Sequence, residues 1–145
     1  MSYFLIGLIV LIALSPLLKA MPTRRQRLIA DLRQTAAISG MTVQLRQSPL
    51  EEREAPLRAF YGRRRSREDE RLVQPVSYGR SGQGWRALEG QWPRSRLKLL
   101  EDLPGGVSAV CEEPQSIGVF WDERGGREDV LRIDQLLKTL LANRD

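Results

Sequence analysis

The chain of 145 residues contains no histidine and only one cysteine. Histidine is the usual general base, the usual member of a catalytic triad and the commonest zinc ligand, so its absence removes the ordinary form of each site. A single cysteine cannot build a disulfide framework, a structural zinc site or an iron–sulfur cluster. That residue, Cys111, ends the apolar stretch 107–111, and we predict a buried core residue rather than a nucleophile. We expect no cofactor and no metal.

Two stretches resemble functional motifs without satisfying them. Residues 79–84 read Gly-Arg-Ser-Gly-Gln-Gly, but a nucleophile elbow needs glycine where Gln83 stands. A P-loop needs Lys-Ser or Lys-Thr where Trp85 and Arg86 follow, so we predict a hairpin turn. The acidic pairs 112–113 and 122–123 are next to predicted turns, which favours solvated carboxylates over a cation site or catalytic acids. No catalytic signature is left, and we do not predict an enzyme.

Lysine is also scarce, since only three of the 23 basic residues are lysines and twenty are arginines. A bias of this kind is typical of GC-rich bacterial genomes as well as of phosphate-binding proteins. The charge is unevenly distributed: residues 19–98 carry a net charge of +10 and residues 99–145 one of −5. A basic half followed by an acidic half suits a domain held beneath an anionic membrane leaflet.

Charged side chains are absent from the first eighteen residues. As a helix this run would be about 27 Å long, near the lower limit for crossing a hydrocarbon core. Tyr3 and Lys19 suit the two interfaces, and Pro16 falls in the last turn. A cleaved signal peptide would need a basic start and small residues before the cut, and a soluble core helix would show a polar stripe. We therefore predict a transmembrane anchor over residues 1–20, with the signal peptide as the main alternative.

The basic residues that follow the apolar run predict its orientation. Lys19, Arg24, Arg25 and Arg27 lie close behind it, and no basic side chain precedes it. The positive-inside rule then places the N-terminus outside and the rest of the chain in the cytoplasm of a bacterium, under its inner membrane. We expect these four side chains to contact anionic lipid headgroups.

Beyond the anchor, hydrophobic periodicity and turn residues predict one small α+β domain, a mostly antiparallel sheet with helices on one face. We predict a basic juxtamembrane helix and strand over 21–46, packed onto the core, a long, charged and mobile loop with room for a helical turn over 47–71, and the domain core over 72–145. The expected order is α-β-loop-ββ-α-ββ-α, with helices at 24–39, 94–103 and 127–142 and strands at 41–46, 72–78, 85–88, 107–112 and 116–121.

An arginine cluster at 63–71 and two tryptophans are the candidate contact residues of the domain. Arginines beside Phe60 and Tyr61 are what a single-stranded nucleic-acid binder would use, but Glu68, Asp69 and Glu70 interrupt the run. A solvated loop or a lipid or protein contact is the favoured interpretation, with nucleic acid the less favoured. Trp121 is expected in the core. The candidate partner or nucleic-acid contacts are Arg63, Arg64, Arg65, Arg67, Trp85 and Trp92.

The first 45 residues resemble the preprotein translocase subunit YajC in layout. A short apolar span is followed by a basic helix, a glycine and a strand, in the sequence LLKAMPTRRQRLIADLRQ…SGMTVQL. The resemblance implies an inner-membrane accessory protein with a cytoplasmic β-rich domain. After Leu45 the chain departs from that family's glycine-rich β pattern, so no functional residue is carried over.

The sequence thus favours a membrane-anchored adaptor or accessory domain that binds a membrane-protein partner. The alternatives are a membrane-tethered nucleic-acid-binding protein, acting through 63–71, and an accessory subunit of a protein-translocation or other inner-membrane complex. The oligomeric state is left open.

Overall fold

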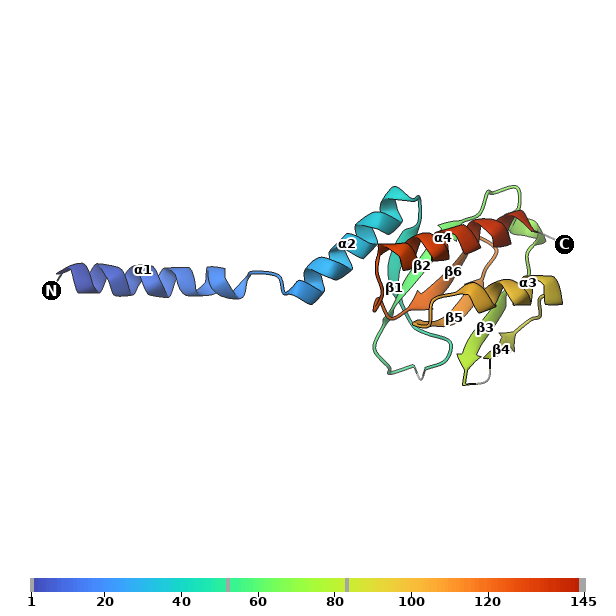
Figure 1. The fold of residues 1–145 in the computed structure, drawn as a ribbon, viewed down its shortest axis with the longest axis horizontal. Coiled ribbons are helices and arrows are strands. Elements are labelled where there is room, and N and C mark those ends of the chain that lie inside the picture. Colours follow the sequence, from blue (N-terminus) through green and yellow to red (C-terminus); the bar gives the residue numbers. More distant parts are fainter. Residues whose placement is uncertain (1, 52, 83, 144–145) are drawn as a thin grey trace. The chain divides into compact units, whose positions relative to one another are not determined.

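The computed structural model describes residues 2–51, 53–82 and 84–143, and it is shown in Figure 1. The chain separates into two compact units, residues 1–30 and residues 31–145.

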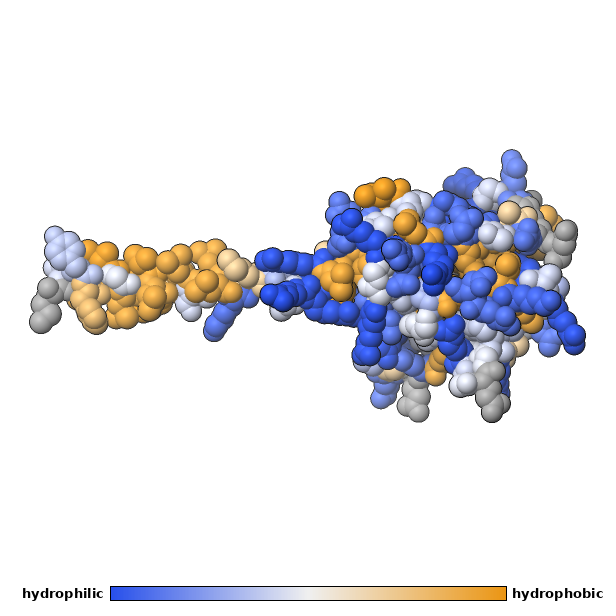
Figure 2. All heavy atoms as spheres, viewed as in Figure 1, coloured by the Kyte–Doolittle hydropathy of each residue, from blue (hydrophilic) through white to orange (hydrophobic). Residues whose placement is uncertain are grey.

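The first unit contains helix α1 (Ser2–Lys19), in which no side chain is buried. By length and composition this helix is long and apolar enough to cross a membrane. Figure 2 shows hydrophobic residues along it, whereas hydrophilic residues predominate on the visible face of the second unit. The amide of Ala20 donates to the carbonyl of Pro16 at 3.1 Å, so the last turn is closed despite the proline.

Helix α2 (Arg24–Ile38) corresponds to the helix predicted at 24–39, and it begins directly after Thr23. The Thr23 hydroxyl accepts a hydrogen bond from the Gln26 amide at 3.2 Å, and the Gln26 side chain accepts one from the Thr23 amide at 2.9 Å. This reciprocal pair is a capping box. The helix ends before Gly40, whose φ of 87° is the left-handed conformation expected of the residue that closes a helix.

The second unit is built on one six-stranded antiparallel sheet in the order β1-β2-β6-β5-β3-β4 (Figure 1). The strands are β1 (Thr42–Arg46), β2 (Arg58–Arg64), β3 (Val76–Ser81), β4 (Gly84–Glu89), β5 (Val107–Glu112) and β6 (Ser116–Trp121). The predicted hairpin of β3 and β4 is present, although most of residues 79–84 belong to the strands and Gln83 lies outside the described residues.

The prediction that residues 47–71 form a loop is wrong for their central part. Strand β2 lies there, paired with β1 on one side and with β6 on the other. Its side chains alternate: Ala59 and Tyr61 belong to the core on the helical side, and Phe60 belongs to the cluster on the opposite face. The apolar part of the strand is short and merges into arginines, so the charge cluster concealed the alternation. The order is therefore α-β-β-ββ-α-ββ-α.

Helices cover one face of the sheet, as predicted. They are the C-terminal part of α2, α3 (Arg94–Leu99), which continues as a 3-10 helix at Leu100–Asp102, and α4 (Arg127–Ala142). A further 3-10 helix lies at Glu70–Leu72. The main core lies between helices and sheet, and Trp121 belongs to it. Its fully buried large side chains are Leu32, Tyr61, Leu100, Val107, Val110, Ile117, Val119, Val130, Ile133, Leu137 and Leu140.

A smaller cluster covers the opposite face of the sheet. Phe60 and Phe120 pack there with ring centroids 5.0 Å apart. A Cβ on Gly118 would lie 2.4 Å from the Phe60 ring and 2.6 Å from the Tyr61 carbonyl oxygen, so the ring needs glycine beneath it. Cys111 packs against this cluster but is only half-buried, which corrects the prediction of a fully buried thiol. Burial raises the pKa of Cys111 to about 12, so the thiol stays protonated at neutral pH.

Candidate functional site at the Arg65–Glu112–Arg96 cluster

Three polar side chains follow one another on the helical side of β2 and the residue after it. Tyr61, Arg63 and Arg65 are two residues apart, so the strand directs all three to the same face. Each meets a buried acid: Tyr61 donates to Glu123 at 2.7 Å, Arg63 to Asp134 at 2.6 Å and Arg65 to Glu112 at 2.5 Å. The strand therefore directs one neutral and two positively charged side chains toward the interior, and each acid that pairs with them comes from a different element or loop.

The first two pairs attach helices to the sheet. Glu123 also accepts two hydrogen bonds from Arg33 on α2, at 2.8 and 3.1 Å, and holds a φ of 57° that is rare for a residue with a side chain. Asp134, on α4, is also paired with Lys138 at 2.8 Å. Arg63 donates in addition to the Ser39 carbonyl at the end of α2. Both acids are thus paired with basic side chains of the domain and serve to hold the helices on the sheet.

The third pair is part of a larger cluster centred on Glu112, at the end of β5. Its carboxylate accepts one bond from Arg65, two from Arg96 at 3.0 and 3.2 Å, and one from the Trp92 indole at 2.6 Å. Four bonds fill the acceptor sites of a carboxylate. Glu112 is therefore an anchor for its neighbours and has no free lone pair with which to act as a base.

The cluster is buried and carries more positive than negative charge. The side chains of Arg65 and Glu112 are 3 % and 4 % exposed, and that of Arg96 is 11 % exposed. Burial alone would raise the pKa of Glu112, but the hydrogen bonds and charge of Arg96, with the bonds from Arg65 and Trp92, outweigh it and hold the pKa below its ordinary 4.5. One carboxylate thus faces two guanidinium groups.

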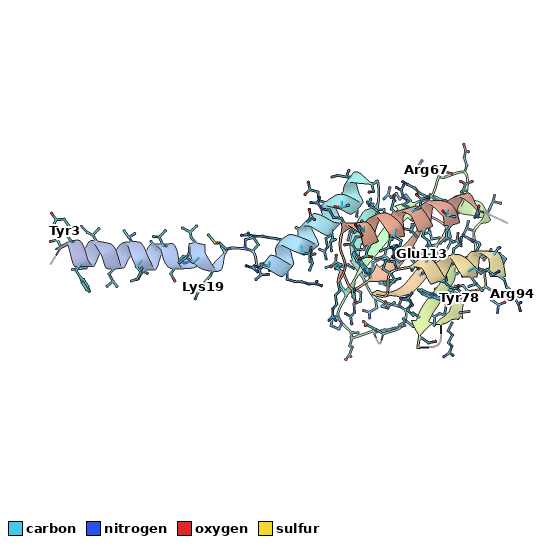
Figure 3. The ribbon with its side chains drawn as sticks, viewed as in Figure 1. Tyr3, Lys19, Arg67, Tyr78, Arg94 and Glu113 are labelled. Atoms are coloured by element: carbon cyan, nitrogen blue, oxygen red, sulfur yellow. The ribbon has the colours of Figure 1, made fainter. Side chains whose placement is uncertain are left out.

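Trp92 sets the position of this cluster. Its backbone amide donates to the Tyr78 hydroxyl at 2.9 Å, and its ring lies 4.4 Å from the guanidinium carbon of Arg96. Figure 3 labels Tyr78 on β3 and Arg94 at the start of α3. Arg96 also donates to the Leu140 carbonyl at 3.0 Å, so α3, α4 and the sheet meet at its side chain.

A pocket of about 430 Å³ opens onto the cluster. Arg65, Arg96 and Glu112 form its buried charged part, and the remainder combines Asp69 and two glutamines with apolar side chains. Its lining residues are Arg65, Asp69, Leu72, Val73, Gln74, Val76, Gln91, Trp92, Pro93, Arg96 and Glu112. The volume falls within the range of small-ligand sites.

The arginines and tryptophans predicted as contacts differ in their burial. Arg65 and Trp92 are buried and Arg63 is largely buried, so these three are held by partners inside the domain and do not form an exposed contact surface. Arg64 and Arg67 are exposed. Trp85 is half-buried against the main core, with the Arg80 guanidinium 4.9 Å from its ring. In the first unit, the predicted lipid contacts Lys19, Arg24, Arg25 and Arg27 are all exposed.

The prediction that both acidic pairs are solvated is wrong for one member of each. Glu112 and Glu123 are buried, whereas Glu113 is partly exposed and paired with Arg46 at 2.6 Å, and Asp122 is exposed. Glu112 follows Val110 at a spacing of two, which directs it to the core, and this alternation was the available signal. Its partners Arg65 and Arg96 come from distant segments, and no local pattern links them to it.

No three histidine, cysteine or acidic side chains in the described part of the chain lie close enough together to hold a metal ion. Comparisons of the chain with protein-family models, with curated proteins and with solved structures find no match. The chemistry of the site therefore has to indicate which kinds of ligand it can bind. Fixed guanidinium groups, an indole and apolar walls can bind an anion, and the saturated carboxylate does not support proton transfer.

Proposed function

We propose that the protein is a membrane-anchored accessory protein whose α+β domain binds a partner at the cytoplasmic face of a bacterial inner membrane. The observation that carries this proposal is α1, in which apolar side chains are exposed around the whole helix. Exposing so many large apolar residues to water is unfavourable, at about 25 cal/mol per Å². A bilayer removes this cost for a helix of this length.

The arginines after α1 support the orientation. Arg24 and Arg27 are exposed, and the structure gives neither an ion pair among the described residues. Basic residues this close to a span keep their side of it in the cytoplasm, and each contributes about 1 kcal/mol of attraction to an anionic surface.

Reporter fusions at both ends of the chain test the orientation. We expect a cytoplasmic C-terminal reporter for the natural chain, and an inverted or mixed orientation when Arg24, Arg25 and Arg27 are all replaced by glutamate. The matched control replaces the exposed Arg53, Arg64 and Arg67 by glutamate, an identical change of charge beyond the region that sets topology. Identical orientation in all three chains would contradict the proposal.

Crosslinking in intact membranes, followed by detergent solubilisation and affinity capture, tests the accessory function. We expect a defined crosslinked species that disappears when Ile9 and Ile12 in α1 are replaced by arginine, because each charge at the centre of a span costs about 2.5–3.5 kcal/mol on insertion. If the protein stays in the membrane fraction but gives no crosslinked species, the accessory function is wrong, while the membrane anchor is still supported.

The layout shared with the translocase subunit YajC supports a narrower form, an accessory subunit of a translocation complex. Its test is whether the crosslinked species contains translocation components. The nucleic-acid alternative has lost support, because Arg63 and Arg65 are held by Asp134 and Glu112. Strongly salt-dependent binding of single-stranded nucleic acid, weakened by Arg64→Ala with Arg67→Ala, would restore it.

A further inference from the structure

The two guanidinium groups beside the pocket contain hydrogen-bond donors without acceptors. Among the described residues, only Nη2 of the Arg65 guanidinium is hydrogen-bonded, although the side chain is 97 % buried, and Nε of Arg65 and Nε of Arg96 are enclosed without a partner. Buried guanidinium donors are normally satisfied, because leaving them unpaired costs about 1–3 kcal/mol each. Since the carboxylate of Glu112 already accepts four bonds, it cannot satisfy them.

The charges of the cluster, like its unpaired donors, favour the binding of an anion. Arg65 and Arg96 carry two positive charges and Glu112 one negative charge, all inside the domain. An anion in the pocket, which Arg65 and Arg96 line, would counter the excess positive charge of this three-residue cluster. Asp69 also lines the pocket and brings the formal charge of the whole lining to zero, so its negative charge disfavours a doubly charged phosphate more than a singly charged carboxylate.

Apolar side chains line part of the remaining wall, alongside Gln74 and Gln91, and an apolar group next to a bound carboxylate can contact them. Leu72, Val73, Val76 and Pro93 line the pocket together with the Trp92 ring. Leu72 is 80 % exposed at the rim of the polar cluster, so its side chain is open to a ligand. The last residue of a peptide carries a carboxylate and a side chain on the same carbon, so it can reach the guanidinium group and the apolar wall together.

We propose that this pocket binds the C-terminal carboxylate of a partner protein whose last residue is apolar. Arg65 holds the carboxylate, and Leu72, Val73 and Trp92 contact the side chain. Arg96 and Glu112 act as positioning residues, since the bonds between them fix the arginines and the indole. The proposal rests on the accessory function and gives the chemistry of the partner segment that such a domain would recognise.

The test uses the full chain in a neutral detergent and follows the Trp92 indole N–H signal by NMR, assigned with Trp92→Phe. The probe is N-acetyl-leucine, a carboxylate on an apolar residue, and its matched control is the uncharged N-acetyl-leucinamide. We expect a saturable shift with the acid and none with the amide at equal concentration. N-acetyl-glutamate amide, whose carboxylate lies on a polar residue, and inorganic phosphate should bind at least fivefold more weakly.

Two variants separate binding from folding. Arg65→Gln should weaken N-acetyl-leucine at least tenfold, with the Trp121 indole signal unchanged as evidence of the fold. Leu72→Ser alters an exposed side chain and should weaken the probe about threefold without affecting the fold. Leu131→Ser, an equal change at a leucine that is 52 % exposed on α4 and does not line the pocket, should leave binding unchanged.

Several results would overturn the proposal: no saturable shift, equal response to acid and amide, equal response to phosphate, or unchanged affinity in both folded variants. These results are distinguishable from a failure of the accessory function, because the probe assay needs neither membrane nor partner. If the crosslinked species persists in Arg65→Gln while probe binding is lost, the domain has a partner that does not use the pocket, and the proposal is wrong.

Discussion

Arginines follow α1 and arginines end β2, and the two groups have opposite environments. Arg24, Arg25 and Arg27 are exposed at the start of α2, whereas Arg63 and Arg65 lie under the helices with buried acids as partners. Arg64, between the two buried arginines, is exposed. The position of an arginine relative to its secondary-structure element therefore decides its environment. Because side chains alternate along β2, every second one points toward the helical layer, and an arginine buried there needs an acidic partner.

Removing Glu112, the acid at the centre of the buried cluster, should cause the largest loss of stability. Glu112→Ala would leave Arg65 and Arg96 without a counter-ion in the interior, and breaking a buried ion pair from one side costs about 3–5 kcal/mol. Chemical denaturation of the full chain in detergent, followed by tryptophan fluorescence, measures this loss. A change below 1 kcal/mol would show that the cluster is hydrated and would remove the contrast with the exposed arginines.

Arg63 and Arg64, adjacent on β2, allow the stability contributions of a buried and an exposed arginine to be compared directly. Arg63→Ala removes the bond to Asp134 and the bond to the Ser39 carbonyl, and we expect a loss of about 1–3 kcal/mol, since Lys138 still pairs with Asp134. Arg64→Ala, one residue away, should change stability by less than about 0.5 kcal/mol. Similar losses for both variants would contradict the alternation of β2.

Acidic pH should reduce the stabilisation that the ion pairs of Glu112 provide. The pKa of Glu112 is lowered in the folded protein, so its contribution to stability is fully present above an ordinary pKa of 4.5 and is lost as the pH falls below that value. We expect the free energy of unfolding to decrease from pH 5 to pH 3, and to decrease less in Glu112→Gln, which cannot titrate. The partly exposed Asp31, whose pKa is lowered by its hydrogen bond and ion pair with Arg127, remains in both proteins. Parallel pH profiles would show that Glu112 does not control acid sensitivity.

The exposed group should show the smallest effect on stability. Replacing Arg24, Arg25 and Arg27 together by glutamate, the change expected to disturb membrane orientation, should alter the free energy of unfolding of the domain by less than about 0.5 kcal/mol. The same denaturation assay checks this. A large loss would mean that these arginines act in folding, and the topology experiment would then need a milder substitution.

Local patterns predicted much of this fold. The apolar run predicted α1, and hydrophobic periodicity with turn residues predicted the helix at 24–39 and the strand at 116–121, which the structure has as α2 and β6. Strand β2 was missed because its core-facing positions include Arg63, and periodicity of apolar residues does not register a buried charge. The pocket could not be predicted either, since Arg65, Trp92 and Glu112 meet only through the tertiary fold.

The sheet order also bears on when the domain can form during synthesis. Strands β1 and β2 touch the remaining strands only through β6, which the ribosome makes after β3, β4 and β5. Until residue 121 emerges, the chain can form only two separate half-sheets, and α4 is still missing. Helix α1 emerges about a hundred residues earlier and, as an anchor, would be delivered to the bilayer while the domain is unfinished. In the proposed anchored protein, the domain would complete its sheet while tethered, and its exposed strand edges would be kept apart from those of other chains.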